Sequence, residues 1–331
     1  MQENQLYFLM VAEELNITKA AQKAFISQQC MSNHIKRLEE AYNTRLFNRR
    51  PRLSLTPAGE LLAQTLRQIK LLEDNLRNEL NEENYNFCGK INLGITWSRA
   101  GLLLPPVISR YKRLYPNIEI LVHNNITDNL ENRLLCGYLD VAVGTGSINS
   151  PHIQVKPLSQ EGVYLVVSDA LLQQYFPNAY PGCKTKFRRG VDLKDFAELP
   201  FILNSPQERF SNLLDKMFRQ QDFHPKVCFR SDSSDIRSQL CGLDLGVSLF
   251  SEFLLQYVAR QNRLQPPSNP LNVFPVNGEF SNYRMIAFYH KNAFQPRYLK
   301  VFIDMLADQV RQCVLQVPQE EASPRPHTKS N

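Results

Sequence analysis

The chain has 331 residues, a hydrophobic fraction of 43% and a formal net charge of +6. This length exceeds one ordinary hydrophobic core and predicts two or three compact units, and the composition excludes a mainly disordered chain. The positive charge permits an anionic partner without establishing one. No basic segment followed by an apolar run opens the sequence, and no apolar run approaches the roughly eighteen residues of a membrane helix. We therefore expect a cytoplasmic protein with no membrane partner.

The seven cysteines are scattered and are never spaced as Cys-x-x-Cys. This pattern argues against a zinc site and against a secreted disulfide framework. We expect reduced thiols, no metal and no cofactor. A redox-sensing pair of Cys228 and Cys241 remains an alternative.

The first part of the chain, to about residue 58, predicts a cluster of short helices. Apolar residues around Leu9 are spaced as one face of a first helix. Thr18 is expected to cap a second helix that runs to about Ala24, and Ser27 to cap a third.

The third predicted helix is amphipathic. Its expected buried stripe consists of Met31, Ile35, Leu38 and Tyr42. The opposite face carries hydrogen-bonding side chains, namely Gln28, Gln29, Ser32, Asn33 and Lys36. A recognition helix presents its first turns to base edges in the major groove, where Gln or Asn binds adenine through two hydrogen bonds. Taken alone, the same face also fits an ordinary solvated helix surface.

A basic segment follows this helix. Four arginines occur within eight residues, at Arg45, Arg49, Arg50 and Arg52. Leu53 and Leu55 alternate with polar neighbours, as in a small two-stranded wing, and arginines at the tip of a hairpin suit phosphates or a narrow minor groove. A polar recognition face followed by a basic wing predicts an all-α winged helix-turn-helix, and this context favours DNA binding.

Residues 8–60 resemble the DNA-binding domain of LysR-type transcriptional regulators. The shared positions are Ala20-Ala21, Ser27-Gln28, Ser32, Ile35, Leu38-Glu39, Leu46-Phe47, Arg49 and the run from Leu55 to Gly59. The resemblance implies a DNA-binding domain over residues 1–59 with a DNA-contacting motif over 18–37. The residues expected to contact the operator are Thr18, Ser27, Gln28, Gln29, Ser32, Asn33, Lys36, Arg49, Arg50 and Arg52.

The chain departs from the family pattern within the recognition helix. Gln29 and Cys30 replace the usual proline and small residue, and Asn33 and His34 replace the common Arg-Gln pair. These changes leave the fold intact, so we expect the operator specificity of this chain to lie at these four positions.

A single long helix is expected from about Pro57 to Asn84. Apolar residues recur every three or four positions, at Leu62, Leu66, Ile69, Leu72, Leu76 and Leu80. Such a stripe calls for a partner helix. The resemblance implies that residues 60–88 form a linker helix that pairs with its twin in a homodimer or within a homotetramer. The alternative is a helix packed on its own body.

Residues 89–310 alternate strands and helices, which predicts parallel sheets with right-handed crossovers. We expect two α/β lobes joined by crossing strands, as in periplasmic binding proteins, with lobe I over 89–160 and 271–310 and lobe II over 161–270. This arrangement resembles the LysR effector domain. Residues 172–192 are interpreted as a surface excursion and residues 311–331 as a disordered tail.

In such a body a ligand lies between the lobes, where strands end and helix N-termini point inward. The residues expected there are Thr96, Ser98, Thr145, Asn204 and Ser205. Their hydroxyls and amides can hold a carboxylate or another small organic or inorganic anion. The alternative is that they only cap helices.

The sequence contains no phosphate-binding glycine loop, GxSxG, HExxH or plausible carboxylate pair, so we expect no enzyme. A solute-binding protein without a DNA role would share the body, but neither the basic head nor the missing leader fits it. A DNA-architectural protein would not need two lobes. The sequence predicts a LysR-type regulator that binds a double-stranded DNA operator under control of a small-molecule effector. RNA polymerase is a further expected partner if the chain activates transcription.

Overall fold

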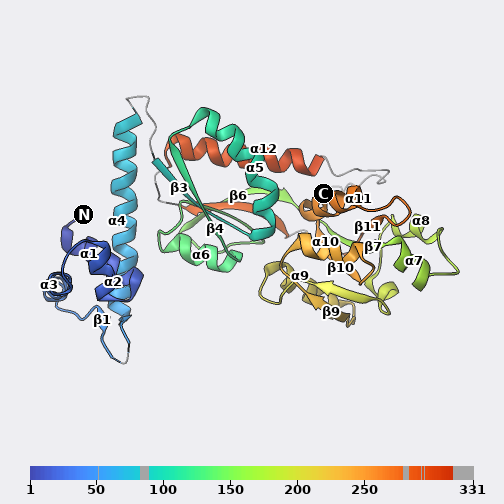
Figure 1. Cartoon of the computed structure of the whole chain (residues 1–331), viewed down its shortest axis with the longest axis horizontal. Helices are drawn as coiled ribbons and strands as arrows, with labels where there is room; N and C mark the ends of the chain where they lie inside the picture. Colours follow the sequence, from blue (N-terminus) through green and yellow to red (C-terminus); the bar gives the residue numbers. More distant parts are fainter. Residues whose placement is uncertain (51, 83–88, 279–282, 292, 294, 316–331) are drawn as a thin grey trace, which may run out of the picture.

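The computed structural model describes residues 1–50, 52–82, 89–278, 283–291, 293 and 295–315. Figure 1 shows three parts in chain order, namely a small helical head, one long helix, and an elongated body of two α/β lobes. Within these described ranges, every helix is too short or too polar to cross a membrane.

The head consists of three helices and a short hairpin. Its elements are α1 (Glu3–Glu14), α2 (Ile17–Lys23), α3 (Gln28–Ala41), β1 (Phe47–Asn48) and β2 (Ser54–Leu55). Phe8, Met31 and Ile35 are buried at its centre, because apolar residues three or four apart share one face of a helix. The predicted winged helix-turn-helix is confirmed.

The cap of α2 differs from the prediction. The Asn16 side chain accepts a hydrogen bond from the backbone N–H of Lys19 at 3.0 Å, so Asn16 and not Thr18 caps the helix. Asn16 has extended backbone angles, whereas Thr18 already lies in the first helical turn. The helix ends at Lys23, one residue before the expected end.

The third helix is close to the prediction. Ser27 caps α3, with its Oγ accepting a hydrogen bond from the backbone N–H of Cys30 at 3.1 Å. Tyr42, however, lies beyond the last turn and is 49% exposed, so it does not belong to the buried stripe.

The long helix α4 (Pro57–Glu82) rises from the head and lies beside lobe I. Its lower part packs into the head through Leu66, which is 1% exposed. Higher up, Leu72 and Leu76 are 52% and 56% exposed. Residues 83–88 and the side chain of Leu80 lie outside the described part of the chain.

Lobe I is a five-stranded sheet covered by helices on both faces. The strands follow the order β4 (Ile118–Asn124), β3 (Gly89–Ile95), β5 (Val141–Thr145), β12 (Arg284–His290) and β6 (Ile153–Gln160). Helices α5 (Trp97–Leu114) and α12 (Arg297–Leu315) pack on one face, and α6 (Thr127–Leu135) packs on the other.

Lobe II is also built on five strands. They follow the order β11 (Leu271–Pro275), β7 (Val163–Ser168), β10 (Val247–Ser251), β8 (Pro200–Leu203) and β9 (Lys226–Arg230). The helices of this lobe are α7 (Asp169–Tyr175), α8 (Cys183–Phe187), α9 (Arg209–Gln220), α10 (Ser234–Gly242) and α11 (Leu255–Leu264).

The expectation of parallel sheets holds only for strands that helices connect. Strands β3, β4 and β5 are parallel, as are β8, β9 and β10. Strand β12 is antiparallel to its neighbours, and so is β7, because the chain enters these strands directly from the other lobe.

Two connections join the lobes, one from β6 to β7 and one from β11 to β12. The expected boundary at residue 271 is therefore wrong. Strand β11 pairs with β7 in lobe II, and the chain returns to lobe I only after it.

The assignment of residues 172–192 to the surface is only partly correct. Most of the segment is exposed, but Leu172, Phe187 and Val191 are at most 3% exposed and belong to the core of lobe II. At the other end, α12 continues to Leu315, so residues 311–315 are helical. The rest of the predicted tail, residues 316–331, lies outside the described part.

Candidate functional site

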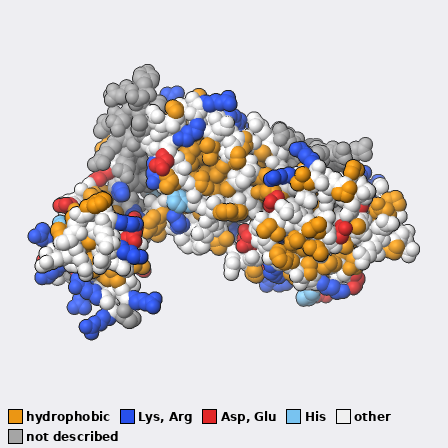
Figure 2. Space-filling view, viewed as in Figure 1, with side chains coloured by type: hydrophobic (Ala, Val, Ile, Leu, Met, Phe, Trp, Pro, Cys, Tyr) orange, Lys and Arg blue, Asp and Glu red, His pale blue; other side chains and the backbone are white. Residues whose placement is uncertain are grey.

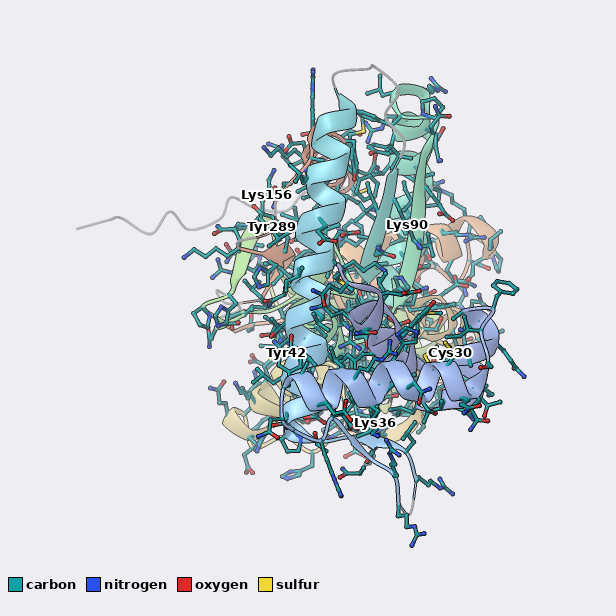
Figure 3. All side chains as sticks on the ribbon, turned by 90° about the vertical axis from the view of Figure 1, so that its left-hand side faces the viewer. Cys30, Lys36, Tyr42, Lys90, Lys156 and Tyr289 are labelled. Carbon is teal, nitrogen blue, oxygen red and sulfur yellow. The ribbon has the colours of Figure 1, made fainter. Side chains whose placement is uncertain are left out.

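The exposed face of α3 is the candidate DNA-reading surface. Gln29, Asn33 and Lys36 lie opposite the buried stripe and are exposed. Ser27 and Gln28 are exposed at the start of the helix, so their polar groups face solvent beside the same surface. Figure 3 looks onto α3, which lies across the lower part of α4 and carries Lys36.

His34 is half-buried and contacts α1. Its Nδ1 lies 2.5 Å from Oδ1 of Asn4, and its ring packs edge-on against Tyr7 with 4.6 Å between the ring centres. The prediction that His34 contributes to operator specificity stays a prediction. This departure from the family pattern fixes α1 against α3, whereas Gln29 and Asn33 remain available to bases.

The wing lies beside this surface. Strands β1 and β2 pair through Phe47 and Leu55, and the side chains of Arg49, Arg50 and Arg52 are exposed. Figure 2 shows Lys and Arg side chains gathered at this end of the head. The head therefore presents a positive surface next to the recognition helix, as contact with DNA phosphates requires.

Glu39 joins the wing to α3. Its Oε1 accepts hydrogen bonds from the backbone N–H groups of Leu46 and Phe47 at 2.8 and 3.3 Å. Its Oε2 lies 3.6 Å from the Arg49 guanidinium. The distance between the recognition helix and the wing is thus held by a side chain of the helix itself.

Replacing Arg50 and Arg52 together by Ala is expected to weaken binding to operator and unrelated DNA alike. The slope of log affinity against log salt is negative, and each lost phosphate contact should reduce its magnitude by about 0.9. Arg188→Ala with Arg189→Ala, an adjacent exposed pair far along the chain in lobe II, is the matched control. Fluorescence anisotropy over a salt series measures both slopes, and an unchanged slope for the wing variant would show that these arginines do not contact DNA.

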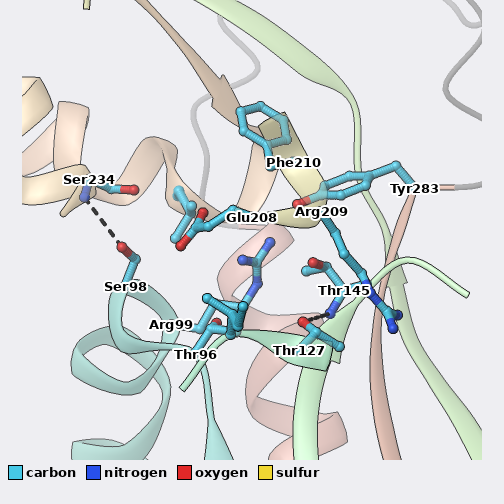
Figure 4. A pocket seen from close by; sticks show the side chains of 12 residues that line it. Thr96, Ser98, Arg99, Thr127, Thr145, Glu208, Arg209, Phe210, Ser234 and Tyr283 are labelled. Atoms are coloured by element: carbon cyan, nitrogen blue, oxygen red, sulfur yellow. Dashed lines mark hydrogen bonds between the residues drawn. The ribbon is translucent and has the colours of Figure 1, made fainter. Parts of the chain in front are cut away.

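The second candidate site is a pocket between the lobes. Figure 4 shows its walls, which are formed by Thr96, Ser98, Arg99, Thr127 and Thr145 of lobe I, Glu208, Arg209, Phe210 and Ser234 of lobe II, and Tyr283 beside the connection. The predicted residues Thr96, Ser98 and Thr145 thus meet in one place.

Asn204 and Ser205 lie behind the wall and do not line the pocket. The Asn204 amide donates to Oε2 of Glu208 at 2.9 Å, and the backbone N–H of Ser205 donates to Oδ1 of Asp232 at 3.0 Å. Both residues position other groups of lobe II. The pocket residues of lobe II were missed because no sequence pattern marks which turn of a distant segment reaches the cleft.

Two helix N-termini of lobe I open into the pocket. Helix α5 begins after Thr96 and α6 after Ile126, and neither residue makes a side-chain cap. The Thr96 hydroxyl is buried without a hydrogen-bond partner among the described residues. Uncapped N–H groups and the helix dipoles favour a negative charge here. The alternative that Thr96 only caps a helix does not hold, because its side chain makes no cap.

A buried ion pair forms the floor of the pocket. The Arg99 guanidinium lies 2.9 Å from Oε2 of Glu161 and donates to Oγ of Ser251 at 3.2 Å. The side chains of Arg99 and Glu161 are 6% and 0% exposed. Burial raises the pKa of the adjacent Tyr283 to about 12, so this phenol stays a hydrogen-bond donor at neutral pH.

Arg209 holds the two lobes together on one side of the pocket. From lobe II its guanidinium reaches Asp128 at 2.6 Å and Glu131 at 2.9 Å, both on α6 of lobe I. It also donates to the backbone carbonyls of Thr145 and Ser147, at 3.1 and 2.8 Å. Four acceptors on lobe I therefore converge on one side chain of lobe II.

Ser98 joins the lobes on the other side. Its hydroxyl donates to the carbonyl of Asp232 at 2.9 Å and accepts from the N–H of Ser234 at 3.3 Å. The Tyr257 hydroxyl donates to the Ser98 carbonyl at 2.8 Å. The pocket is thus enclosed by direct contacts between the lobes.

Helix α6 connects this region to the long helix. Its first turn carries Asp128 and Thr127, and just after its last turn Tyr138 lies beneath Arg67 of α4. The Arg67 guanidinium carbon is 4.1 Å from the centre of the Tyr138 ring. Gly137 also lies close against Arg67, so a movement of α6 would reach α4 through the segment that follows it.

The state of the two thiols does not support the alternative that Cys228 and Cys241 form a redox-sensing pair. Cys241 is fully buried, and burial raises its pKa to about 12. Burial also raises the pKa of the Cys228 thiol, so neither forms a reactive thiolate near neutral pH. The described residues include no group of three or more side chains suited to a metal ion.

The sequence matches two family profiles. Residues 4–60 match "Bacterial regulatory helix-turn-helix protein, lysR family", and residues 86–311 match "LysR substrate binding domain". Among curated relatives, the HTH-type transcriptional regulator CysL of Bacillus subtilis is 24% identical over 303 residues, which cover 90% of this chain and 94% of CysL. The HTH-type transcriptional activator IlvY of Salmonella typhimurium is 24% identical over 281 residues, covering 84% of this chain and 90% of IlvY.

Solved structures share the fold over nearly the whole length. Full-length OxyR from Pseudomonas aeruginosa superimposes with a TM-score of 0.68 at 20% identity and covers 98% of this chain and 99% of its own. Full-length CbnR in complex with its target DNA gives a TM-score of 0.56 at 18% identity, over 95% of this chain and all of CbnR.

Proposed function

Because the chain belongs to the LysR family of transcriptional regulators, we propose that a small anion bound between its lobes modulates operator binding by α3 and the wing. The observation that carries this proposal is the enclosed pocket with two uncapped helix N-termini and the unpartnered Thr96 hydroxyl. A protein that binds operators acts in the cytoplasm, and we propose this location for the chain. RNA polymerase is a further proposed partner if the chain activates transcription.

The proposed coupling runs through α6. A ligand that fills the pocket stabilises the closed arrangement in which Arg209 holds Asp128 and Glu131. The far end of α6 bears on Arg67 of α4 through Tyr138, and α4 is continuous with the head. Ligand binding and DNA binding then share one equilibrium, and each shifts the other.

The exposed leucines of α4 support a dimer as the active form. Leu72 and Leu76 face solvent on a helix of 26 residues whose lower part is packed into the head. A second α4 would cover them and place two heads on one symmetric operator. Both a homodimer and a homotetramer built from such dimers are compatible with this pairing.

The test replaces Thr96 by Val, which keeps the shape of the side chain and removes the unpartnered hydroxyl. A panel of organic and inorganic anions is first screened by thermal shift with the full chain. We expect Thr96→Val to abolish the response of operator affinity to the anion that binds, while affinity without the anion stays within about twofold. The exposed Thr185→Val is the control, and a normal response of Thr96→Val would contradict the site.

A further inference from the structure

Glu208 is an acidic side chain in the wall of a pocket that we assign to an anion. Glu208 immediately precedes α9 and is half-buried. Its side chain lines the pocket from lobe II. Among the described residues, its carboxylate accepts one side-chain hydrogen bond, from the Asn204 amide, and no Lys, Arg or His nitrogen lies within 4.0 Å of it. Burial raises the pKa of this carboxyl, because the charged form is removed from water without a directly paired cation.

The nearby arginines are held by other groups. Arg99 is paired with Glu161, and Arg209 with Asp128 and Glu131. Arg237 donates to the Ser248 hydroxyl, the Leu249 carbonyl and the Ser234 hydroxyl, at 3.1, 2.8 and 3.0 Å. These guanidinium groups act on Glu208 through space but do not bond to it. A positive charge delivered by the ligand would therefore find a carboxylate with free acceptor capacity.

The opposite wall has the reverse polarity. Lobe I contributes the uncapped N-termini of α5 and α6 and the unpartnered Thr96 hydroxyl. Arg99 is 5% exposed, its Nε has no hydrogen-bond partner among the described residues, and its guanidinium points into the pocket in Figure 4. Lobe I thus presents donors and partial positive charge, and lobe II presents the Glu208 carboxylate beside Arg209, whose guanidinium is already paired with Asp128 and Glu131.

We propose that the effector is a zwitterion, a small acid that also carries a primary amine. Its carboxylate lies on lobe I at the N-termini of α5 and α6, and its ammonium group lies on Glu208 of lobe II. Such a ligand satisfies both walls and bridges them, so its binding favours the closed lobes. This inference rests on the proposed function, and it adds the positive group that a simple anion lacks.

The test compares α-amino acids with the matching α-hydroxy acids, which keep the carboxylate and replace the amine by a hydroxyl. The twenty common amino acids and their hydroxy analogues are screened by thermal shift with the full chain, and the pair that binds best is measured by calorimetry. We expect the amino acid to bind at least about tenfold more tightly than its analogue, because a site with a buried acceptor rejects a ligand that leaves the acceptor unpaired. Glu208→Gln should reduce this preference to less than about threefold.

The matched control is Glu198→Gln, because the Glu198 side chain is 78% exposed and, among the described residues, bonds only to Lys226. It should keep the full preference for the amino acid. If the hydroxy acid binds as tightly as the amino acid, the zwitterion is excluded while an anionic effector stands. A preference unchanged in Glu208→Gln would remove Glu208 from the site. If neither kind of acid binds, this inference fails, and the wider panel of organic and inorganic anions decides the proposed function separately.

Discussion

Replacing Arg99 by Met is expected to lower the free energy of unfolding of the body by about 3–5 kcal/mol. The change leaves Glu161, whose side chain is fully buried, without its cation. The free-energy cost of removing this carboxylate from water is then no longer offset by an ion pair. In the folded state the group must either stay charged without a partner or bind a proton. Urea denaturation of the full chain, followed by circular dichroism, measures the loss as a shift of the body transition.

The control is a surface pair. Lys156 and Asp304 form an ion pair with side chains 38% and 66% exposed, so Lys156→Met should cost less than about 1 kcal/mol. The double variant Arg99→Met with Glu161→Leu should recover most of the loss, because no buried charge remains unpaired. An Arg99→Met variant no less stable than Lys156→Met would contradict the assignment of a buried ion pair.

Replacing both Leu72 and Leu76 by Glu is expected to convert the protein to monomers and to weaken operator binding by roughly 10²–10⁴-fold. A leucine side chain that becomes fully buried contributes roughly 1.5–3 kcal/mol, and two symmetric helices would bury four of them. Monomers also lose the gain in affinity that comes from linking two heads on one site. Sedimentation and operator binding measure the two effects.

Leu264→Glu is the control, because this leucine is 74% exposed on α11, outside the long helix. It should leave both the mass and the affinity unchanged. A Leu72→Glu, Leu76→Glu variant with the mass of the wild type would favour the alternative that α4 packs only on its own chain. The contact between Arg67 and Tyr138 already occupies one side of α4 in this way.

The head was predictable because its signals are local. The stripe of α3, the Ser27 cap and the wing each depend on residues within a few positions of one another. The error at Tyr42 arose because the helix ends one residue before it. The contacts of His34 with Asn4 and Tyr7 depend on α1, a neighbouring element, so no local pattern indicated them.

The pocket was only half predictable. Thr145 ends β5, and Thr96 and Ser98 come just after β3, so the rule that ligands bind at strand ends locates these residues. Arg99 was missed because arginine is usually exposed, and its burial depends on Glu161 and on Ser251 of the other lobe.

We propose that one chain couples a ligand between its lobes to DNA at its head. The most direct measurement is the affinity of the full chain for an operator fragment, enriched from genomic DNA, with and without the small molecule that binds the pocket. We expect a change of roughly 5- to 150-fold, and an equal change in small-molecule affinity when the operator is present, because coupling is reciprocal. Identical affinities in the two conditions, with the pocket saturated, would contradict the account.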